Sequence, residues 1–105
     1  ILTSNIGLKV GDIVTLSFAY KTTIDNDAIS VYAYQARGLS IDSFAVLTGS
    51  NSVYKFYTGN FTIRDWGLNN LGETLGSIAL YNKNPFYLKD VKLEIGTVCT
   101  NVPMQ

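Results

Sequence analysis

The sequence contains no histidine and one cysteine, and only 15% of its 105 residues are charged. Without histidine, the commonest general base of enzymes is missing. Structural zinc sites normally use four Cys or His ligands, and a catalytic thiol normally has a histidine as its base. Cys99 has no second cysteine to pair with, and we interpret it as a small apolar residue. The sequence therefore predicts neither a zinc site nor a thiol enzyme.

An excess of charge of one sign is also missing. Eight Lys and Arg residues balance eight Asp and Glu residues, and no two basic residues are adjacent. Proteins that bind nucleic acid neutralise its phosphates with clustered Lys and Arg, so we expect no nucleic-acid partner. No apolar stretch approaches the ~20 residues that span a bilayer, so we expect no membrane insertion.

The length of the chain predicts one domain that buries its core without disulfides or metals. The first residues show no charged segment followed by an apolar one, as a signal peptide would, and the chain does not begin with Met. We therefore expect a single β-sandwich module over residues 1–105, excised from a longer chain.

Alternation of apolar and small or polar residues is the main pattern that is present. It runs from Val14 to Tyr20 within residues 12–21 and is typical of a strand with one face in the core. Short strands at intervals of about a dozen residues predict an all-β fold, an antiparallel β-sandwich or jelly roll. The further strands are expected at residues 28–36, 44–49, 53–63, 76–82 and 86–96.

Two of the remaining segments carry glycines that affect their prediction. Gly59 and Asn60 predict a bulge or a turn that divides residues 53–63 in two. Residues 64–76 place leucines at helical spacing, but the glycines among them argue against more than a single turn.

The last predicted strand breaks the alternation. Phe86 and Leu88 have one parity, and Val91 and Leu93 have the other, so a regular strand would put the two pairs on opposite faces. An extra residue near Lys89–Asp90 would return all four to the core face, and we predict a β-bulge there. The alternative is a central strand that is buried on both faces.

No motif predicts a catalytic centre. The eight carboxylates lie mostly in predicted turns, where Asp commonly accepts hydrogen bonds from backbone amides. A glycosidase needs two facing carboxylates, and no motif proposes such a pair, so we expect no enzyme activity. The segment Asp25-Asn26-Asp27 offers oxygen ligands of the kind that calcium prefers, but the later Gly and Glu of a calcium-binding loop are missing. A turn is the simpler interpretation.

Aromatic and amide side chains are the positive signal. Seven Tyr, five Phe and one Trp make up 12% of the chain. Sugar rings present flat C–H faces edged with hydroxyl groups, and Tyr and Trp offer planar apolar platforms with polar tips. We therefore predict a ligand-binding surface of aromatic residues with a neighbouring amide, and the candidates are Tyr32, Tyr34, Tyr57, Trp66, Tyr81 and Asn82.

These candidates also have structural alternatives. Tyr32 and Tyr34 share one parity of their strand and could form its inward face, with Val31 outside. Trp66 lies in a segment expected to be a loop, and loops often carry function on a rigid scaffold, yet the ring could also plug one end of the sandwich. The sequence leaves both alternatives open.

Three segments together resemble a pattern of carbohydrate-binding-module-like jelly rolls, especially those attached to bacteriophage tail and baseplate proteins. They are Thr15–Lys21 (TLSFAYK), residues 54–62 ending in NFT, and Asp90–Thr97 (DVKLEIGT). The resemblance implies a last strand that closes the core, placed centrally beside the first strand. Relatives often carry two acids before the valine, one of which can bind calcium. Here the pair is Lys89–Asp90, so we expect no cofactor.

The resemblance implies a non-catalytic carbohydrate-binding module of a phage tail or baseplate protein. Its expected partners are a host cell-wall or surface polysaccharide and other virion tail proteins, and its expected location is the extracellular virion tail. Two alternatives are open: a structural or oligomerisation domain of the virion that binds no sugar, and a glycan-binding module of a secreted glycosidase. Low charge and high tyrosine content suit protein interfaces as well as sugar sites.

Overall fold

The computed structural model describes residues 7–34, 41–74 and 76–101, and within them the chain forms six strands and no helix. The predicted all-β class is confirmed, while residues 35 and 36 of the predicted second strand lie outside the described part. No helix among the described residues is long and apolar enough to cross a membrane. The strands are β1 (Ile13–Thr22), β2 (Ala28–Tyr34), β3 (Ile41–Thr48), β4 (Lys55–Thr62), β5 (Ser77–Tyr81) and β6 (Phe86–Ile95).

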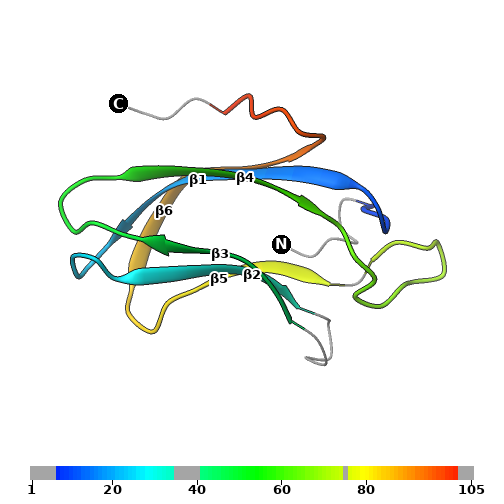
Figure 1. Cartoon of the computed structure of the whole chain (residues 1–105), viewed down its shortest axis with the longest axis horizontal. Helices are drawn as coiled ribbons and strands as arrows, with labels where there is room; N and C mark the ends of the chain where they lie inside the picture. The colour runs from blue at the N-terminus through cyan, green and yellow to red at the C-terminus, as the bar shows by residue number, and fades with distance from the viewer. Residues whose placement is uncertain (1–6, 35–40, 75, 102–105) are drawn as a thin grey trace.

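The strands form two antiparallel three-stranded sheets that lie face to face (Figure 1). One sheet has the order β4-β1-β6 and the other the order β3-β2-β5. The connections from β1 to β2, from β3 to β4 and from β5 to β6 cross between the sheets at the same end of the molecule, on the left in Figure 1. The antiparallel β-sandwich expected from the sequence is therefore the observed architecture.

The core lies between the two sheets and is built from one parity of each strand. On β1 the inward-pointing side chains are every second one from Val14 to Tyr20, and on β2 they are those of Ile29, Val31 and Ala33. All of them are buried. Because successive side chains of a strand point to opposite faces, the alternation that predicted these strands also determines which residues form the core.

Aromatic rings close the side of the sandwich where β3 faces β4. Phe44 of β3 stacks on Phe61 of β4 with ring centroids 4.2 Å apart, and Trp66 meets Phe44 edge-on at 6.4 Å. The Nε1 of Trp66 donates a hydrogen bond to Asp42 Oδ2 at 2.7 Å. Aromatic pairs of these kinds contribute about 0.5–1.5 kcal/mol each beyond their buried area, so this seam ties the two sheets together.

Gly59 does not divide β4, and the prediction of a bulge or turn at Gly59-Asn60 is wrong. The pairing with β1 is regular from Lys55 to Thr62. A Cβ atom at Gly59 would overlap the hydroxyl group of Tyr57. The glycine therefore provides space for that ring on the inward face of the strand.

The predicted bulge in β6 is confirmed. Two steps along β1, from Ser17 to Ala19, correspond to three steps along β6, from Lys92 to Lys89. Within the bulge, Asp90 has a φ angle of +55°, in the left-handed region that residues other than glycine rarely adopt.

β6 lies beside β1, as the resemblance implied, but at the edge of its sheet and not centrally. The alternative of a strand buried on both faces is therefore wrong. The bulge brings Leu88 and Val91 to the side that faces β5, yet they are 39% and 50% exposed, because β5 and β6 are both edge strands and the seam between them stays open. This open seam is an apolar groove of about 320 Å³, lined by Leu16, Ile78, Ala79, Leu80, Phe86, Leu88 and Val91.

The left-handed backbone of the bulge can be tested at Asp90. Asp90→Val should lower the free energy of unfolding by about 1–2 kcal/mol, because a β-branched side chain is strained at positive φ. Asp90→Gly should stay within about 1 kcal/mol of the parent chain. Urea unfolding followed by circular dichroism measures both, and equal losses in the two variants would contradict the bulge geometry.

Candidate functional site

The middle of the outer face of the sheet β4-β1-β6 is covered by the chain itself, whereas Tyr87 at one end of this face is 52% exposed. Thr15 and Ser17 point away from the core, yet both are buried, because residues 96–101 fold back over this sheet (orange to red in Figure 1). Thr15 Oγ1 donates to the Gly96 carbonyl at 2.8 Å, and Asn101 Nδ2 donates to Ser17 Oγ at 3.1 Å. We call residues 96–101 the C-terminal segment.

Glu94 of β6 fixes the C-terminal segment in place. Its Oε2 accepts a hydrogen bond from Thr100 Oγ1 at 2.6 Å and its Oε1 accepts one from Thr100 N at 2.9 Å, and these bonds lower the pKa of the Glu94 carboxyl. Hydrogen bonds with the hydroxyls of Thr58 and Ser17 lower the pKa of the Cys99 thiol. Cys99 is half-buried and lies among polar groups, and its Sγ also donates to the Asn101 carbonyl at 3.7 Å.

The outer face of the other sheet, β3-β2-β5, carries the tyrosines. β2 alternates buried and half-buried residues, and its outward positions are Ser30, Tyr32 and Tyr34. β5 pairs Tyr81 with Ser30, so Tyr81 points to the same side, and it is 59% exposed. β3 pairs Ser43 with Tyr32. We call these five residues the tyrosine face.

The orientation of β2 decides between the two alternatives for its tyrosines. Val31 is buried in the core, so Tyr32 and Tyr34 point outward. Their ring centroids lie 5.8 Å apart and their planes are tilted by 31°. The two rings therefore form a strip along β2.

Two shallow depressions meet at Tyr81. One of about 360 Å³ lies over the tyrosine face and is lined by Ser30, Tyr32, Ser43 and Tyr81. Because Ser30 and Tyr81 line both depressions, the two form one open surface along β2, aromatic at one end and polar at the other. The second depression, of about 420 Å³, is lined by Asn26, Asp27, Ala28, Ser30, Tyr81, Asn82 and Lys83.

Asp27 organises the polar end of this surface. Its Oδ2 accepts hydrogen bonds from Asn82 Nδ2 at 2.8 Å and from Asn84 Nδ2 at 3.0 Å, and its Oδ1 accepts one from Ala28 N at 3.1 Å. The bonds from the two amides, that of Asn82 first, lower the pKa of the Asp27 carboxyl. An amide carries two donor hydrogens and an acceptor oxygen, so this contact orients Asn82 without using all of its hydrogen-bonding capacity.

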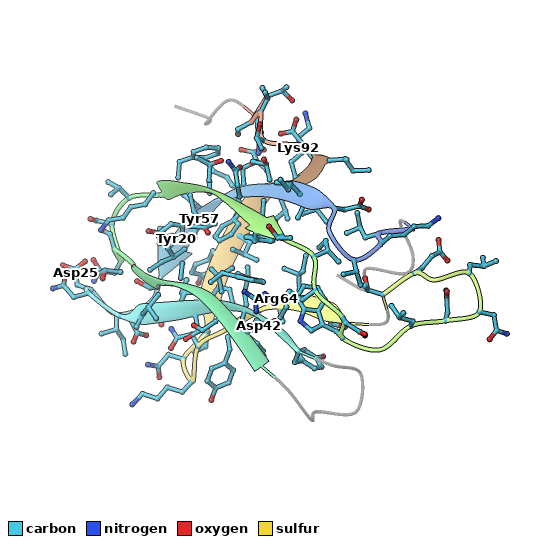
Figure 2. All side chains as sticks on the ribbon, turned by 45° about the vertical axis from the view of Figure 1, so that its right-hand side comes forward. Tyr20, Asp25, Asp42, Tyr57, Arg64 and Lys92 are labelled. Carbon is cyan, nitrogen blue, oxygen red and sulfur yellow. The ribbon has the colours of Figure 1, made fainter. Side chains whose placement is uncertain are left out.

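The segment Asp25-Asn26-Asp27 is a tight turn at one tip of the molecule, where Figure 2 labels Asp25. Asn26 has a φ angle of +62°, and Asp25 Oδ1 accepts a hydrogen bond from Asn51 N at 3.2 Å. The carboxylates of this turn therefore hold amide groups of the protein, as expected for turn residues. Among the described residues, no group of three or more His, Cys, Asp and Glu side chains is placed to hold a metal.

Two of the six predicted site residues lie elsewhere. Tyr57 points between the sheets (Figure 2), with its ring centroid 5.2 Å from that of Phe18, and burial raises the pKa of its hydroxyl. Trp66 is 1% exposed, so it takes the structural role that the sequence left open. Tyr57 packs against the core and Trp66 is buried in it, so neither ring belongs to the candidate surface. The structure brings together the other four: Tyr32, Tyr34, Tyr81 and Asn82.

Sequence reasoning missed three members of this surface. Ser30 lies two residues before Tyr32 on the same face of β2, so the alternation of the strand alone could have placed it on this surface. Ser43 and Asp27 had no local signal, because each reaches the surface through a contact between separate segments. Asp27 and Asn82, for example, are 55 positions apart.

No family model matches the chain, and neither a curated protein nor a solved structure matches it. A functional interpretation therefore rests on the geometry of the two sheet faces and on the resemblance of the three segments described above.

The contacts of Asp27 predict a pH-dependent contribution to stability. Because its pKa is lowered in the folded chain, the ionised group stabilises the fold above the pKa of the unfolded chain, and this contribution is lost as the pH falls through the folded pKa. Asp27→Asn should therefore destabilise the chain near neutral pH, and its difference from the parent should shrink in acid.

Thermal unfolding between about pH 7 and about pH 2, followed by circular dichroism, measures this difference across the range in which carboxyl groups titrate. Asp25→Asn is the control in the same turn; Asp25 accepts a backbone hydrogen bond, and we expect a smaller loss. A difference between Asp27→Asn and the parent that stays constant across the range would contradict the assigned role.

Proposed function

We propose that the chain is a non-catalytic carbohydrate-binding module, and that the tyrosine face, together with Asp27 and Asn82, is its sugar-binding surface. The observation that carries the proposal is the gathering of Tyr32, Tyr34 and Tyr81 on one outer sheet face, over two continuous depressions. On the opposite outer face, the C-terminal segment lies over Thr15 and Ser17 in the middle of the sheet.

The chemistry of this surface suits sugars. Tyrosine rings pack against the C–H faces of pyranose rings, and aromatic packing contributes about 0.5–1.5 kcal/mol per ring beyond buried area. Sugar hydroxyls both donate and accept hydrogen bonds. The surface offers a carboxylate acceptor from Asp27, an amide from Asn82 and hydroxyls from Ser30 and Ser43, which between them supply donors and acceptors.

The shape of the surface favours a polysaccharide bound along its length. The two depressions are shallow and continuous and follow β2, whereas a site for a chain end or a single sugar would enclose its ligand. A surface of this kind binds weakly, in the range of about 4–8 kcal/mol that corresponds to millimolar to micromolar dissociation constants. Many copies on one particle would add avidity.

The resemblance of the three segments supports placing the module on a phage tail or baseplate. There it would adhere to a host cell-surface polysaccharide, and other tail proteins would be its further partners. Multivalent display on a virion is the setting in which weak single sites give useful adhesion.

A structural or oligomerisation role is favoured by a different observation, the open apolar seam between β5 and β6. Large exposed apolar patches mark interaction surfaces. This seam lies between the sheets and the tyrosine face lies outside them, so a role in assembly does not compete with sugar binding.

Removal of single rings tests the binding surface. Tyr81→Ala and Tyr32→Ala should each weaken polysaccharide binding by about three- to tenfold, as expected for the loss of one aromatic contact. Tyr87→Ala is the matched control, because Tyr87 is 52% exposed on the outer face of the other sheet, and it should leave binding unchanged.

Affinity electrophoresis and titration calorimetry measure these effects with a panel of soluble probes: hydroxyethylcellulose, xylan, galactomannan and soluble bacterial wall polysaccharides. The parent chain should be retarded by at least one probe. Lack of retardation by every probe, even when the chain is displayed in several copies on a carrier, would contradict the proposed function. An equal loss in Tyr87→Ala would place the site elsewhere.

A further inference from the structure

The part of β6 that follows the bulge is an edge strand whose only protection is a pair of opposite charges, Lys92 and Glu94. β6 lies at the edge of its sheet, so a row of its backbone groups faces away from β1. Natural edges are commonly blunted by Pro, charged side chains, especially Lys, inward-pointing charges or bulges. The bulge at Asp90 interrupts the first half of the strand, but residues 91–95 read Val-Lys-Leu-Glu-Ile, with Ile95 74% exposed. This segment is available to pair with another strand.

The opposite edge of the same sheet has a different character. Exposed apolar patches often mark interaction surfaces, and on β6 the exposed Leu88 and Val91 line the apolar groove. The exposed positions of β4, by contrast, are all polar: Lys55, Thr58, Asn60 and Thr62.

Residues 91–95 are complementary to themselves when two copies run antiparallel. A two-fold axis at Leu93 places Val91 opposite Ile95 of the second copy, and Lys92 opposite Glu94 of the second copy, each pair occurring twice. The pairing with β1 puts the three apolar residues on the inward side of the strand and the two charged residues on the outward side. Every cross-strand pair therefore joins side chains of one face, apolar with apolar and positive with negative. Within one chain Lys92 Nζ already lies 3.8 Å from Glu94 Oε2 and both side chains contact Thr100, so the charged pairs of the dimer would extend this network.

Neighbouring registers lack this match. An axis at Lys92 would place two lysines directly opposite each other and Asp90 opposite Glu94. An axis at Glu94 would place two glutamates opposite each other. Like charges directly across a strand pair are destabilising, so the complementarity is specific to the axis at Leu93.

We propose that two copies of the chain form a two-fold dimer through antiparallel pairing of residues 91–95 of β6, which joins two sheets of the order β4-β1-β6 into one continuous sheet. Backbone hydrogen bonds of the added strand hold the copies together, and the side-chain pairs fix the register.

The second copy also covers part of the open seam. Val91 lines the groove between β5 and β6, and in the dimer Ile95 of the second copy lies next to it. The pairing therefore removes from water an exposed edge and the adjoining end of the apolar groove, and burial of apolar surface favours association.

The arrangement of the two copies also affects the proposed sugar-binding function. Only this part of the inference depends on that function. An antiparallel pair that keeps each sheet face on its own side has its two-fold axis perpendicular to the sheet. Both sheets of the order β3-β2-β5 then lie on the same side, and the two tyrosine faces point in one direction. A surface that bears polysaccharide would meet both sites at once.

The mass of the 105-residue chain in solution tests the dimer. Light scattering and sedimentation equilibrium from about 10 µM to about 1 mM, the range of weak associations, should show the mass rising from 11.5 kDa toward twice that value. Ile95→Lys should raise the dissociation constant at least about tenfold, because a charge then lies in the apolar row of the edge. Val46→Lys, an exposed aliphatic residue on edge strand β3, is the matched control and should leave the mass unchanged.

A second variant tests the register. Combining Val91→Glu with Ile95→Lys should restore association, because the new carboxylate then lies opposite the new ammonium group of the second copy. Amide exchange of the parent should slow with concentration in residues 91–95 and not in β4. A parent that stays monomeric over the whole range would overturn the proposal, as would a double variant as dissociated as Ile95→Lys alone, or protection on β4.

Discussion

β1 is covered on both of its faces, and this double burial determines what the rest of the molecule can present. Its inward-pointing side chains pack into the core. Its outward-pointing Thr15 and Ser17, which are small and polar, lie under the C-terminal segment. Because Thr15 and Ser17 are held by backbone and amide groups of that segment, the middle of the outer face of the sheet β4-β1-β6 is already occupied by protein. On the outer face of β3-β2-β5, three tyrosine rings meet hydroxyls and a held carboxylate over continuous depressions, and the proposed function depends on this grouping.

The strands, their inward parity and the bulge were predictable because each is encoded locally. A period of two identifies a strand and its core face, and the change of parity between Leu88 and Val91 required an extra residue. The errors arise where a residue's role depends on a distant partner. Gly59 gives room to Tyr57, which the alternation cannot distinguish from a break in the strand. Trp66 follows β4 in a loop-like segment, yet it is buried against Phe44, which belongs to the opposite sheet. Asp27 joins the candidate surface only because the turn after β5 returns to it.

The two surfaces that the fold leaves open have different chemistry and suit different partners. The tyrosine face combines aromatic rings with hydroxyl, amide and carboxylate groups, which suits a ligand that is itself part apolar and part polar. After the bulge, residues 91–95 of β6 alternate between apolar and charged side chains, and the two charges are of opposite sign. This pattern suits pairing with a second strand of the same sequence. Pairing at that edge would orient two tyrosine faces in the same direction, so assembly and adhesion would reinforce each other through avidity.

The central claim is that sugar binds to the tyrosine face while the C-terminal segment stays in place over the opposite sheet. Nuclear magnetic resonance titration with oligosaccharides cut from a polysaccharide that binds the chain tests this claim most directly. The account predicts changes in chemical shift along β2 and β5 and around Asn82, with the amides of Thr100 and Asn101 unchanged. Changes concentrated on β1 and β4, or release of residues 96–101 on binding, would contradict it.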